Sequence, residues 1–343
     1  MPTSKSAEPI LVTMGEPAGV GPEVAVAAWR ALGGHVGERK LILVGAPDVF
    51  ASYGKVPDDA VLATTAAARR TPGRPDPANA KATVEAIARA VNMAIEGTAG
   101  AIVTAPINKA VLLQTGFRFP GHTDYLAHLT STPRAVMMLA SGTIRVVPLT
   151  VHVPLAWVPR LITMDAIIET AEITLAALKR DFGIEAPRLA VAGLNPHAGE
   201  QGLFGTEEMR VIAPAVRAAR RSGIDARGPF AADSLFPLAL KGGVDAVVCM
   251  YHDQGLAPFK LLHFTDGVNV TIGLPFVRTS PDHGTAHDIA GRGVADPGSM
   301  AAALRLAAAL AQPQPKHLAG VAVPAARRRL RSRTAGSLAQ SAQ

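Results

Sequence analysis

Apolar and polar positions divide this chain into short buried runs and longer amphipathic stretches that alternate with one another. The apolar runs, which we interpret as β-strands, are residues 10–14, 41–44, 101–104, 145–151, 189–192 and 246–250. The amphipathic stretches, which we interpret as helices, are residues 22–31, 78–96, 164–182, 207–222, 234–240 and 300–311. Because the two kinds alternate without hairpin signals, the pattern predicts parallel βαβ units in an α/β fold.

The length of the chain predicts two domains, because 343 residues exceed what a single hydrophobic core usually supports. We expect two α/β/α domains with mostly parallel sheets and an active-site cleft between them. The first domain comprises residues 1–130 plus 291–312, and the second comprises residues 131–290. Residues 313–343 form a basic tail that we expect to be disordered.

Composition excludes several classes of protein. Hydrophobic residues make up 48% of the chain and aromatic residues only 4%, as in an ordinary α/β protein rich in Ala, Val and Leu. No apolar run reaches the roughly 18–20 residues of a membrane span, and the N-terminus lacks the apolar segment of a signal peptide, so we expect a cytoplasmic protein without membrane contact. The single cysteine, Cys249, lies inside an apolar run, which excludes a disulfide framework and predicts a buried thiol.

The net charge of +7 is concentrated at the C-terminus. From Lys316 onward the chain has six basic residues and no acidic ones, which leaves a net charge of +1 on the rest. A nucleic-acid-binding domain would carry its positive charge on the folded body, so the distribution argues against a specific nucleic-acid partner.

One segment, residues 247–299, carries most of the candidate chemistry. It opens as an apolar run and breaks abruptly into the polar sequence YHDQG at Tyr251. Buried parallel strands end in this way when their last residues leave the core to meet a ligand. In open α/β sheets, ligands bind in the crevice beyond the carboxyl ends of the strands. We therefore expect most of an active site here.

Three histidines share the same local context at the end of an apolar run. They are His152 after VVPLTV, His197 after LAVAGLNP and His252 after VVCMY. If these strands lie in one parallel sheet, the three imidazoles emerge on the same edge. Three neutral imidazoles with an open fourth position suit a catalytic Zn²⁺ ion. A single strand-end histidine more often caps backbone groups, and it is the repetition of the pattern that favours a metal site.

A second set of polar residues predicts an anion site. Lys260, Asn269 and Arg278 follow one another at intervals of nine, and His122 and Thr123 lie in an earlier polar turn. Lysine supplies a compact charge and arginine a two-pronged fork, the combination that a phosphate or carboxylate substrate requires.

The cofactor signal is a loop rather than a glycine-rich fingerprint. The glycines of GEPAGVGPE, Gly15, Gly19 and Gly21, match neither the dinucleotide fingerprint nor a P-loop. Residues 280–293, SPDHGTAHDIAGRG, instead resemble the loop with which the β-decarboxylating dehydrogenases hold the adenosine part of NAD(P). That resemblance implies cofactor contacts from His283, Gly284, Thr285 and Asp288.

Taken together, the motifs resemble those of the 4-hydroxythreonine-4-phosphate dehydrogenase family. They are GEPAGVGPE, PGHTDYL, LNPHAGEQGLFGTEE, YHDQGLAPFK and GVNVTIGLPFVRTSPDHGTA, and the likeness spans about residues 10–311. The resemblance implies an isopropylmalate-dehydrogenase-like fold and a homodimer whose second domain carries the interface, with residues of both subunits completing the site.

The same resemblance implies roles for individual residues. His152, His197 and His252 would bind a divalent metal, with Zn²⁺ ahead of Mg²⁺ or Co²⁺. The substrate would be bound by His122, Thr123, Lys260, Asn269 and Arg278. The reaction would be the NAD- or NADP-dependent oxidation of a phosphorylated hydroxy amino acid in pyridoxal phosphate biosynthesis. Asp253, Asp233 and Lys260 are candidates for the proton transfer, and the sequence does not choose among them.

Three alternatives stay open at this point. Relatives with similar motifs oxidise 4-phospho-D-threonate or 4-phospho-D-erythronate, or dihydrodiol dicarboxylates from aromatic compounds. A metal-dependent aldolase or isomerase without nicotinamide would use the same histidines, and a metabolite-binding protein without catalysis would need fewer polar strand ends. The sequence does not decide between NAD and NADP. It also does not identify the physiological metal or the role of the basic tail.

Overall fold

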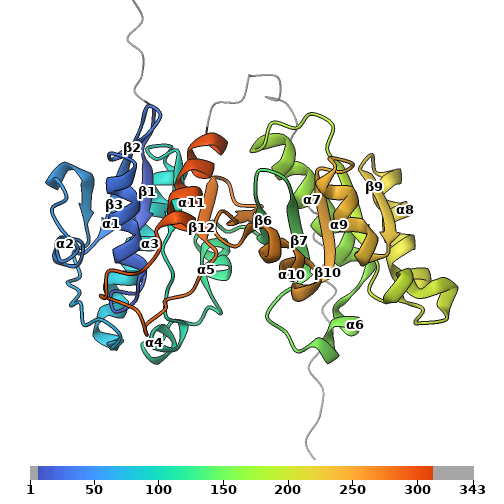
Figure 1. Ribbon diagram of the computed structural model, residues 1–343, viewed down its shortest axis with the longest axis horizontal. Helices are drawn as coiled ribbons and strands as arrows, with labels where there is room; N and C mark the ends of the chain where they lie inside the picture. The colour runs from blue at the N-terminus through green and yellow to red at the C-terminus, as the bar shows by residue number, and fades with distance from the viewer. Residues whose placement is uncertain (1–6, 312–343) are drawn as a thin grey trace, which may run out of the picture. The chain divides into compact units, whose positions relative to one another are not determined.

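The centre of the molecule is one mixed β-sheet, seen in a computed structural model that describes residues 7–311 (Figure 1). All of these residues belong to one compact unit, Met1–Gln312, and the predicted basic tail lies outside the described residues. The twelve strands follow the order β2-β3-β1-β5-β12-β11-β6-β7-β10-β8-β9, with β4 also paired to β3. The strands are β1 Ile10–Thr13, β2 His35–Val36, β3 Arg39–Gly45, β4 Val61–Ala63, β5 Ala101–Thr104, β6 Val136–Ala140, β7 Arg145–Thr150, β8 Arg188–Ala192, β9 Asp225–Phe230, β10 Ala246–Tyr251, β11 Val268–Ile272 and β12 Val277–Pro281.

Helices cover both faces of this sheet, as alternate residues of the strands show. In β1, Ile10 and Val12 pack in the same core cluster as residues of α1 and α11, whereas Leu11 packs with residues of α3. In β10, Val248 packs with residues of α7 and α8, and Val247 packs with residues of α9 and α10. The helices are α1 Gly21–Ala31, α2 Pro47–Ala51, α3 Ala80–Ile95, α4 Lys109–Gln114, α5 His122–Leu129, α6 Val158–Leu161, α7 Met164–Arg180, α8 Ala213–Arg221, α9 Ala232–Leu240, α10 His252–His263 and α11 Gly298–Leu310. The predicted α/β fold with a mostly parallel sheet is confirmed.

The middle of the sheet departs from the prediction of strands and helices without hairpins. β6 pairs antiparallel with both β7 and β11, and β11 pairs antiparallel with β12. Both β6–β7 and β11–β12 are hairpins, joined by residues 141–144 and 273–276. The connections lack the Asn-Gly or Asp-Gly pair that marks a tight hairpin in a sequence, which is why the pattern missed them. Three successive antiparallel pairings make the parallel strands on the two sides of the sheet run in opposite directions.

The strands that precede the three histidines are direct neighbours. β10 lies between β7 and β8 and is parallel to both, with Val248 paired to Val147 on one side and to Val191 on the other. The condition that we set for a shared edge is therefore met, and the carboxyl ends of β7, β10 and β8 lie next to one another.

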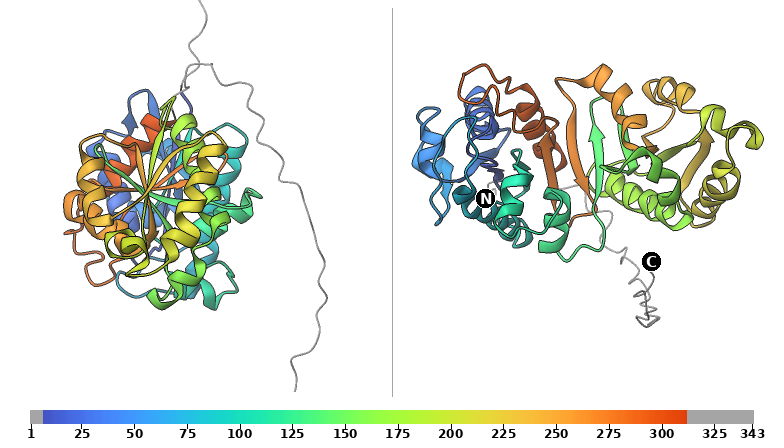
Figure 2. Two further views of the ribbon diagram at one scale, coloured as in Figure 1. Left: turned by 90° about the vertical axis from the view of Figure 1, so that its right-hand side faces the viewer. Right: turned by 90° about the horizontal axis from the view of Figure 1, so that it is seen from below.

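The division into two domains stays a prediction. The sheet is continuous between β1 and β9, and one core cluster contains residues from both sides of the proposed boundary, such as Val24 of α1 and Leu178 of α7. Two further views show the helices on the two faces of the sheet (Figure 2).

Two expectations about individual segments are met. Cys249 is fully buried and is a free thiol, and burial raises the pKa of that thiol above its usual value. Between residues 7 and 311, no helix is both long enough and apolar enough to cross a lipid bilayer.

Candidate functional site: an anion cavity beside a histidine pair

A cavity of about 660 Å³ lies at the middle of the sheet, between residues of β5, β6, β7, β11 and β12. All five predicted substrate-binding residues line it, together with two of the predicted cofactor residues and one predicted metal ligand. These residues are His122, Thr123, Lys260, Asn269, Arg278, His283, Gly284 and His152. Residues that are up to about 160 positions apart in the sequence thus converge, as the anion-site hypothesis requires.

Arg278 is the most unusual group in the cavity. It lies in β12, its side chain is 3% exposed, and its guanidinium donates hydrogen bonds to the hydroxyl groups of Thr104 and Thr271. Within residues 7–311 no carboxylate forms an ion pair with it, and burial lowers its pKa to about 9, so the group still carries its charge at neutral pH. A buried charge without a counter-ion is costly, so this arrangement indicates an anionic ligand that is bound in the cavity.

Two neighbours of Arg278 have buried polar atoms without partners among the described residues. Asn269 Oδ1 accepts no hydrogen bond, and His122 Nε2 neither donates nor accepts one. Burial, followed by the positive charges of Arg278 and Lys109, holds the pKa of His122 well below its usual value, so the imidazole is neutral. Because buried polar atoms in native structures are normally hydrogen-bonded, these two atoms indicate the position of a polar ligand.

Lys260 is half-buried on the wall of the same cavity and is paired with a carboxylate. Its Nζ lies 3.1 Å from Asp282 Oδ2, and Asp282 also lines the cavity. Burial raises the pKa of Asp282, although the ion pair with Lys260 acts in the opposite direction. The cavity therefore contains one positive charge that is paired with a carboxylate, Lys260, and one that is not, Arg278.

The predicted cofactor loop packs against the glycine turn of residues 15–21. The backbone N–H of Val20 donates to the carbonyl of Thr285 at 2.9 Å, and a Cβ atom at Gly19 would lie 2.7 Å from that carbonyl oxygen. Only glycine fits at this contact, since real Cβ atoms do not approach a backbone oxygen so closely. Two motifs that the sequence separates by more than 250 positions therefore contact each other directly, and Gly19 allows the close approach.

The cofactor loop contains further unsatisfied groups. His283 Nε2 and His287 Nε2 are buried without partners in the described part of the chain, while His283 Nδ1 lies 2.9 Å from the carbonyl of Gly284. Asp288 is exposed, and its side chain forms no hydrogen bond or ion pair with any residue between 7 and 311. These open donors and acceptors fit a ligand that forms several hydrogen bonds, such as a nucleotide.

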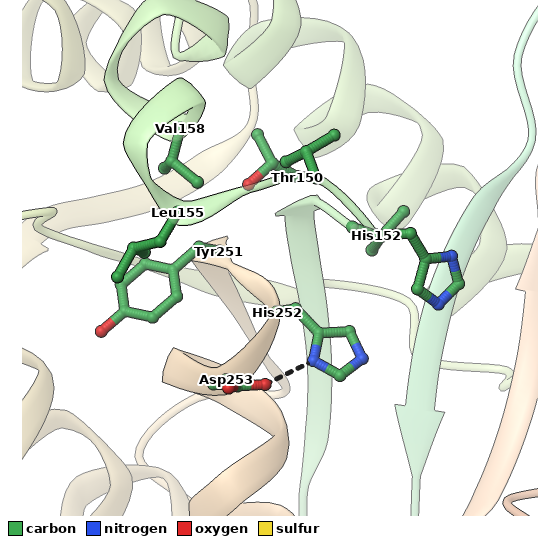
Figure 3. Close-up of a pocket in the computed structure, with 9 residues that line it drawn as sticks. Thr150, His152, Leu155, Val158, Tyr251, His252 and Asp253 are labelled. Atoms are coloured by element: carbon green, nitrogen blue, oxygen red, sulfur yellow. Dashed lines mark hydrogen bonds and ion pairs between the residues drawn. The ribbon is translucent and has the colours of Figure 1, made fainter.

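His152 and His252 lie side by side at the ends of β7 and β10 (Figure 3). Their ring centroids are 5.7 Å apart, and both line a smaller cavity of about 290 Å³. Thr150 Oγ1 donates to the carbonyl of Met250 at 2.8 Å, which fixes the two strand ends relative to each other. Burial and then the charge of Lys109 lower the pKa of His152, which keeps its imidazole neutral and able to bind a metal.

Asp253 orients His252. Its Oδ1 lies 2.6 Å from His252 Nδ1, and the other ring nitrogen of His252, Nε2, therefore points away from Asp253 (Figure 3). A carboxylate that receives one ring N–H is the usual partner of a metal-binding histidine. Two imidazoles on one tetrahedral Zn²⁺ ion would have ring centroids roughly 5–6 Å apart, so the pair fits half of a metal site.

His197 is not brought to this pair. It is exposed, its nearest aromatic neighbour is Phe204 at 6.2 Å between centroids, and it lines neither cavity. Within residues 7–311, no group of three or more His, Cys, Asp or Glu side chains could hold a metal ion. One chain therefore presents a pair of histidines, and His197 is located on a neighbouring loop of the same edge.

A buried glutamate holds the loop that presents His197. Residues 197–201 all have positive φ, between 41° and 82°, which is unfavourable for residues other than glycine. Glu208, which is 3% exposed, accepts hydrogen bonds from the backbone N–H groups of Leu194 and Asn195 at 2.8 and 2.7 Å, and from Asn195 Nδ2 at 3.0 Å. We infer that these bonds compensate for the backbone strain of the loop.

Replacing Glu208 by glutamine should therefore destabilise the protein. The variant replaces a charged acceptor by an amide, whose NH₂ group cannot accept the hydrogen bonds that a carboxylate oxygen accepts. This should lower the free energy of unfolding by about 2–3 kcal/mol. Urea denaturation measures the change. Glu207→Gln is the matched control, since Glu207 is half-buried and contacts the loop only through the hydrogen bond from Asn195 Nδ2, without the bonds from the N–H groups of Leu194 and Asn195. A loss of the same size there would contradict the special role of Glu208.

The three candidates for proton transfer occupy different places. Lys260 lines the larger cavity, and Asp253 lines the smaller one beside His252. Asp233 lies in the first turn of α9, is exposed, and lines neither cavity within one chain. The role of each stays a prediction, and Lys260 is the candidate closest to the predicted substrate residues.

The sequence reasoning missed several groups in the larger cavity. Thr104, Lys109, Asp124 and Asp282 line it, and we had assigned no role to them. Lys109 follows the end of β5 within APINK, the same strand-end context that drew attention to the histidines, so the signal was available. Thr104 carried no signal, because a threonine at the end of a β-strand is ordinary.

His122 should make the protein sensitive to acid. Its pKa is lowered in the folded state, so above the unfolded-state value of about 6.5 neither state binds the proton and His122 has no effect on stability. Below that pH the unfolded chain takes up a proton that the folded chain rejects, and the free energy of unfolding falls as pH falls. Urea denaturation at pH 7.5, 6.5 and 5.5 should show a smaller loss for His122→Gln than for the wild type. Equal losses in both proteins would contradict the buried neutral imidazole.

Comparison with known proteins adds to this geometry. A family model described as "Pyridoxal phosphate biosynthetic protein PdxA" matches residues 39–307. The 4-hydroxythreonine-4-phosphate dehydrogenase of Paracoccus denitrificans is 52% identical over 318 residues, which cover 88% of this chain and 97% of the relative. The solved structure of the enzyme of that name from Klebsiella pneumoniae has a TM-score of 0.79 at 38% identity and covers 89% of this chain and 100% of that one. A terephthalate 1,2-cis-dihydrodiol dehydrogenase from Burkholderia xenovorans has a TM-score of 0.62 at 29% identity, with 88% and 98% of the two chains covered.

Proposed function

The chain belongs to the pyridoxal phosphate biosynthetic protein PdxA family, and from this premise we propose the reaction that its cavity performs. The substrate is 4-phosphohydroxy-L-threonine, and the chain oxidises its secondary alcohol with NAD or NADP and a divalent metal. The product, 2-amino-3-oxo-4-(phosphooxy)butanoate, loses CO₂ to give 3-amino-2-oxopropyl phosphate. Enzymes with the name 4-hydroxythreonine-4-phosphate dehydrogenase are oxidoreductases, and this chain is an oxidoreductase of the same family.

The single observation that carries the choice of substrate class is the uncompensated charge of Arg278. A phosphorylated amino acid brings a dianionic phosphate and a carboxylate, and a buried guanidinium binds such groups through two parallel hydrogen bonds. Asn269 and His122, whose buried atoms lack partners, supply an acceptor and a neutral ring nitrogen for the remaining polar atoms of the substrate.

The histidine pair supports a metal beside this site. His152 and His252 would hold a divalent ion, with Zn²⁺ as the first choice and Mg²⁺ or Co²⁺ as alternatives, because neutral imidazoles prefer borderline transition metals. The ion would act as a Lewis acid toward the substrate hydroxyl group. Since the described residues of one chain supply two histidines together, we propose that the site is completed in a homodimer, with His197 as the third ligand.

The loop around His283 supports a nicotinamide cofactor. Its buried ring nitrogens without partners, and Gly284 at the edge of the cavity, are placed to bind the nucleotide next to the substrate. The carbonyl of Thr285 accepts a hydrogen bond from the N–H of Val20, which holds the backbone of this loop in place. With Asp288 these residues form the proposed cofactor-binding loop, and the preference for NAD or NADP is part of what the experiment below measures.

The residues of the chain orient the substrate for the oxidation. Arg278 and Lys260 fix its anionic groups, Thr123 and Asn269 bind polar atoms, and the hydroxyl-bearing carbon then lies toward His152. The base that takes the hydroxyl proton would be Lys260, Asp253 or Asp233. A nicotinamide bound at the proposed cofactor loop would supply the hydride acceptor. The resulting β-keto acid can release CO₂ because the electron pair of the broken C–C bond is delocalised as an enolate.

One alternative has support from a specific observation. The likeness to a dihydrodiol dehydrogenase, at 29% identity, favours a substrate with carboxylates instead of phosphate. The cation pattern of the cavity suits either anion, and 4-phospho-D-threonate or 4-phospho-D-erythronate would also fit. A metal-dependent aldolase or isomerase without nicotinamide would leave the proposed cofactor-binding loop without a role.

The deciding experiment combines metal analysis with NAD(P)H formation. The purified chain should contain a tightly bound divalent metal and should reduce NAD or NADP with 4-phosphohydroxy-L-threonine at least tenfold more efficiently than with the two phosphosugar acids or a dihydrodiol dicarboxylate. Faster turnover of one of those compounds would replace the proposed substrate, and absence of nicotinamide binding would favour the aldolase or isomerase.

The mass of the active species tests the homodimer, and cell fractionation tests the cytoplasmic location predicted from the sequence.

A further inference from the structure

Lys109 is a cation of the larger cavity to which neither the sequence nor the family resemblance gave a role. It is the first residue of α4, and four residues separate it from the end of β5 at Thr104. Asn108 caps this helix by accepting a hydrogen bond from the N–H of Val111 at 3.2 Å, so the helix start and the Lys109 backbone are fixed. The long side chain then extends along the cavity wall.

The ammonium group of Lys109 lies over the start of α5. A Cβ atom added to Gly121, the residue that precedes α5, would lie 3.3 Å from Lys109 Cε and 3.6 Å from Lys109 Nζ. The absent side chain at Gly121 therefore leaves the space through which the ammonium group reaches the first turn of α5. No side chain caps this turn, and Gly121, His122 and Thr123 all line the cavity.

The charges around this point are not compensated within the described residues. Lys260 is paired with Asp282, but Lys109 forms no ion pair with any carboxylate of residues 7–311, and neither does Arg278. Asp124 also lines the cavity, without an ion pair to Lys109. Lys109 and Arg278 both lie near enough to His122 for their charges to lower the pKa of its imidazole. Two uncompensated cations match the two charges of a phosphate monoester.

We propose that Lys109 is a phosphate-binding residue, which together with Arg278 and the first turn of α5 forms the subsite for the phosphoryl group of the substrate. This inference rests on the proposed function and deepens it. The uncapped N–H groups of α5 add hydrogen-bond donors and the favourable end of the helix dipole, and His122 Nε2 adds a further polar atom without a partner. Because Lys109 also lies near His152, a phosphate held here leaves the rest of the substrate directed toward the histidine pair.

Lys109→Met tests the proposal with inorganic phosphate as the probe. Isothermal titration calorimetry of the full-length chain should show phosphate affinity reduced on the order of tenfold to a hundredfold, which is the range for a lost charge-assisted hydrogen bond. The KM for the phosphorylated substrate should rise by a similar factor while kcat changes less than about threefold. Lys109→Arg keeps the charge and should restore most of the phosphate affinity.

Lys81→Met is the matched control. Lys81 is an exposed lysine in the first turn of α3 and lines neither cavity. Its replacement therefore lowers the net charge of the protein by the same amount but removes no positive charge from the cavity. Unchanged phosphate affinity and KM in Lys109→Met would overturn the assignment of Lys109 while leaving the proposed function intact. An equal loss in Lys81→Met would also overturn it, because the effect would then reflect net charge alone. If the wild type binds phosphate but forms no NAD(P)H, the proposed function fails, and the phosphate titration alone decides the role of Lys109.

Discussion

Replacing Arg278 by methionine should reduce kcat/KM by about a thousandfold or more while leaving the folded protein as stable as the wild type or more stable. The loss of activity follows from the removal of a buried, charged donor to the anionic substrate, which is worth about 4 kcal/mol in such settings. The gain in stability follows because the unliganded chain then no longer buries a guanidinium without a counter-ion. Steady-state kinetics and urea denaturation of the same preparation measure both effects.

Arg39→Met provides the matched control for this pair of effects. Arg39 is also buried, at 5% exposure, but it donates to the carbonyl groups of Glu8 and Ala311 and lines neither cavity. Its loss should destabilise the protein and leave KM unchanged. If Arg278→Met instead destabilised the protein by several kcal/mol with KM unaltered, Arg278 would be a structural link between β12 and Thr104 of β5, and the anion cavity would lose its main support.

Replacing His252 by alanine should abolish tight binding of the divalent metal and lower turnover by at least about a thousandfold. The variant removes one of two imidazoles that lie 5.7 Å apart. His152 and the proposed ligand His197 would be left without it, and this incomplete ligand set should not hold such an ion against dialysis. Asp253→Asn should have an intermediate effect, because loss of an orienting carboxylate typically weakens metal binding about 10–100-fold. Metal content after dialysis and NAD(P)H formation at saturating metal are the two measurements.

His35→Ala controls for the loss of a histidine as such. His35 is exposed in β2 and lines neither cavity, so metal content and turnover should stay at wild-type values. Wild-type activity that survives exhaustive chelation would remove the metal from the proposed reaction. Retention of both metal and turnover in His252→Ala would instead mean that the ion is held elsewhere.

Several features of the site followed from the sequence because each residue has a local cause. A strand that is apolar to its last position and then turns polar must bring that polar group to the edge of the sheet, and this placed His152 and His252 correctly. Lys260, Asn269 and Arg278 were predicted from their residue types and even spacing, and all three line one cavity. The glycine turn was also interpreted correctly as a tight connection between a strand and a helix, β1 and α1.

Other features depend on contacts between distant segments, which local pattern does not encode. The antiparallel strands β6 and β11 reverse the direction of half the sheet, although nothing in residues 136–140 distinguishes them from a parallel strand. The absence of a counter-ion for Arg278 is a property of its whole environment, including Thr104 on another strand. The left-handed loop that displaces His197 from the histidine pair depends on Glu208, which follows it by eleven positions.

The sequence by itself thus determined the fold class and the edge of the sheet at which His152 and His252 lie, because hydrophobic periodicity and strand-end polarity act over a few residues. Only the tertiary structure decided which polar side chains face one another. It joined Lys109 to the start of α5, paired Lys260 with Asp282 and left Arg278 unpaired, because each of these outcomes is set by the packing of strands that lie next to one another in space and far apart along the chain.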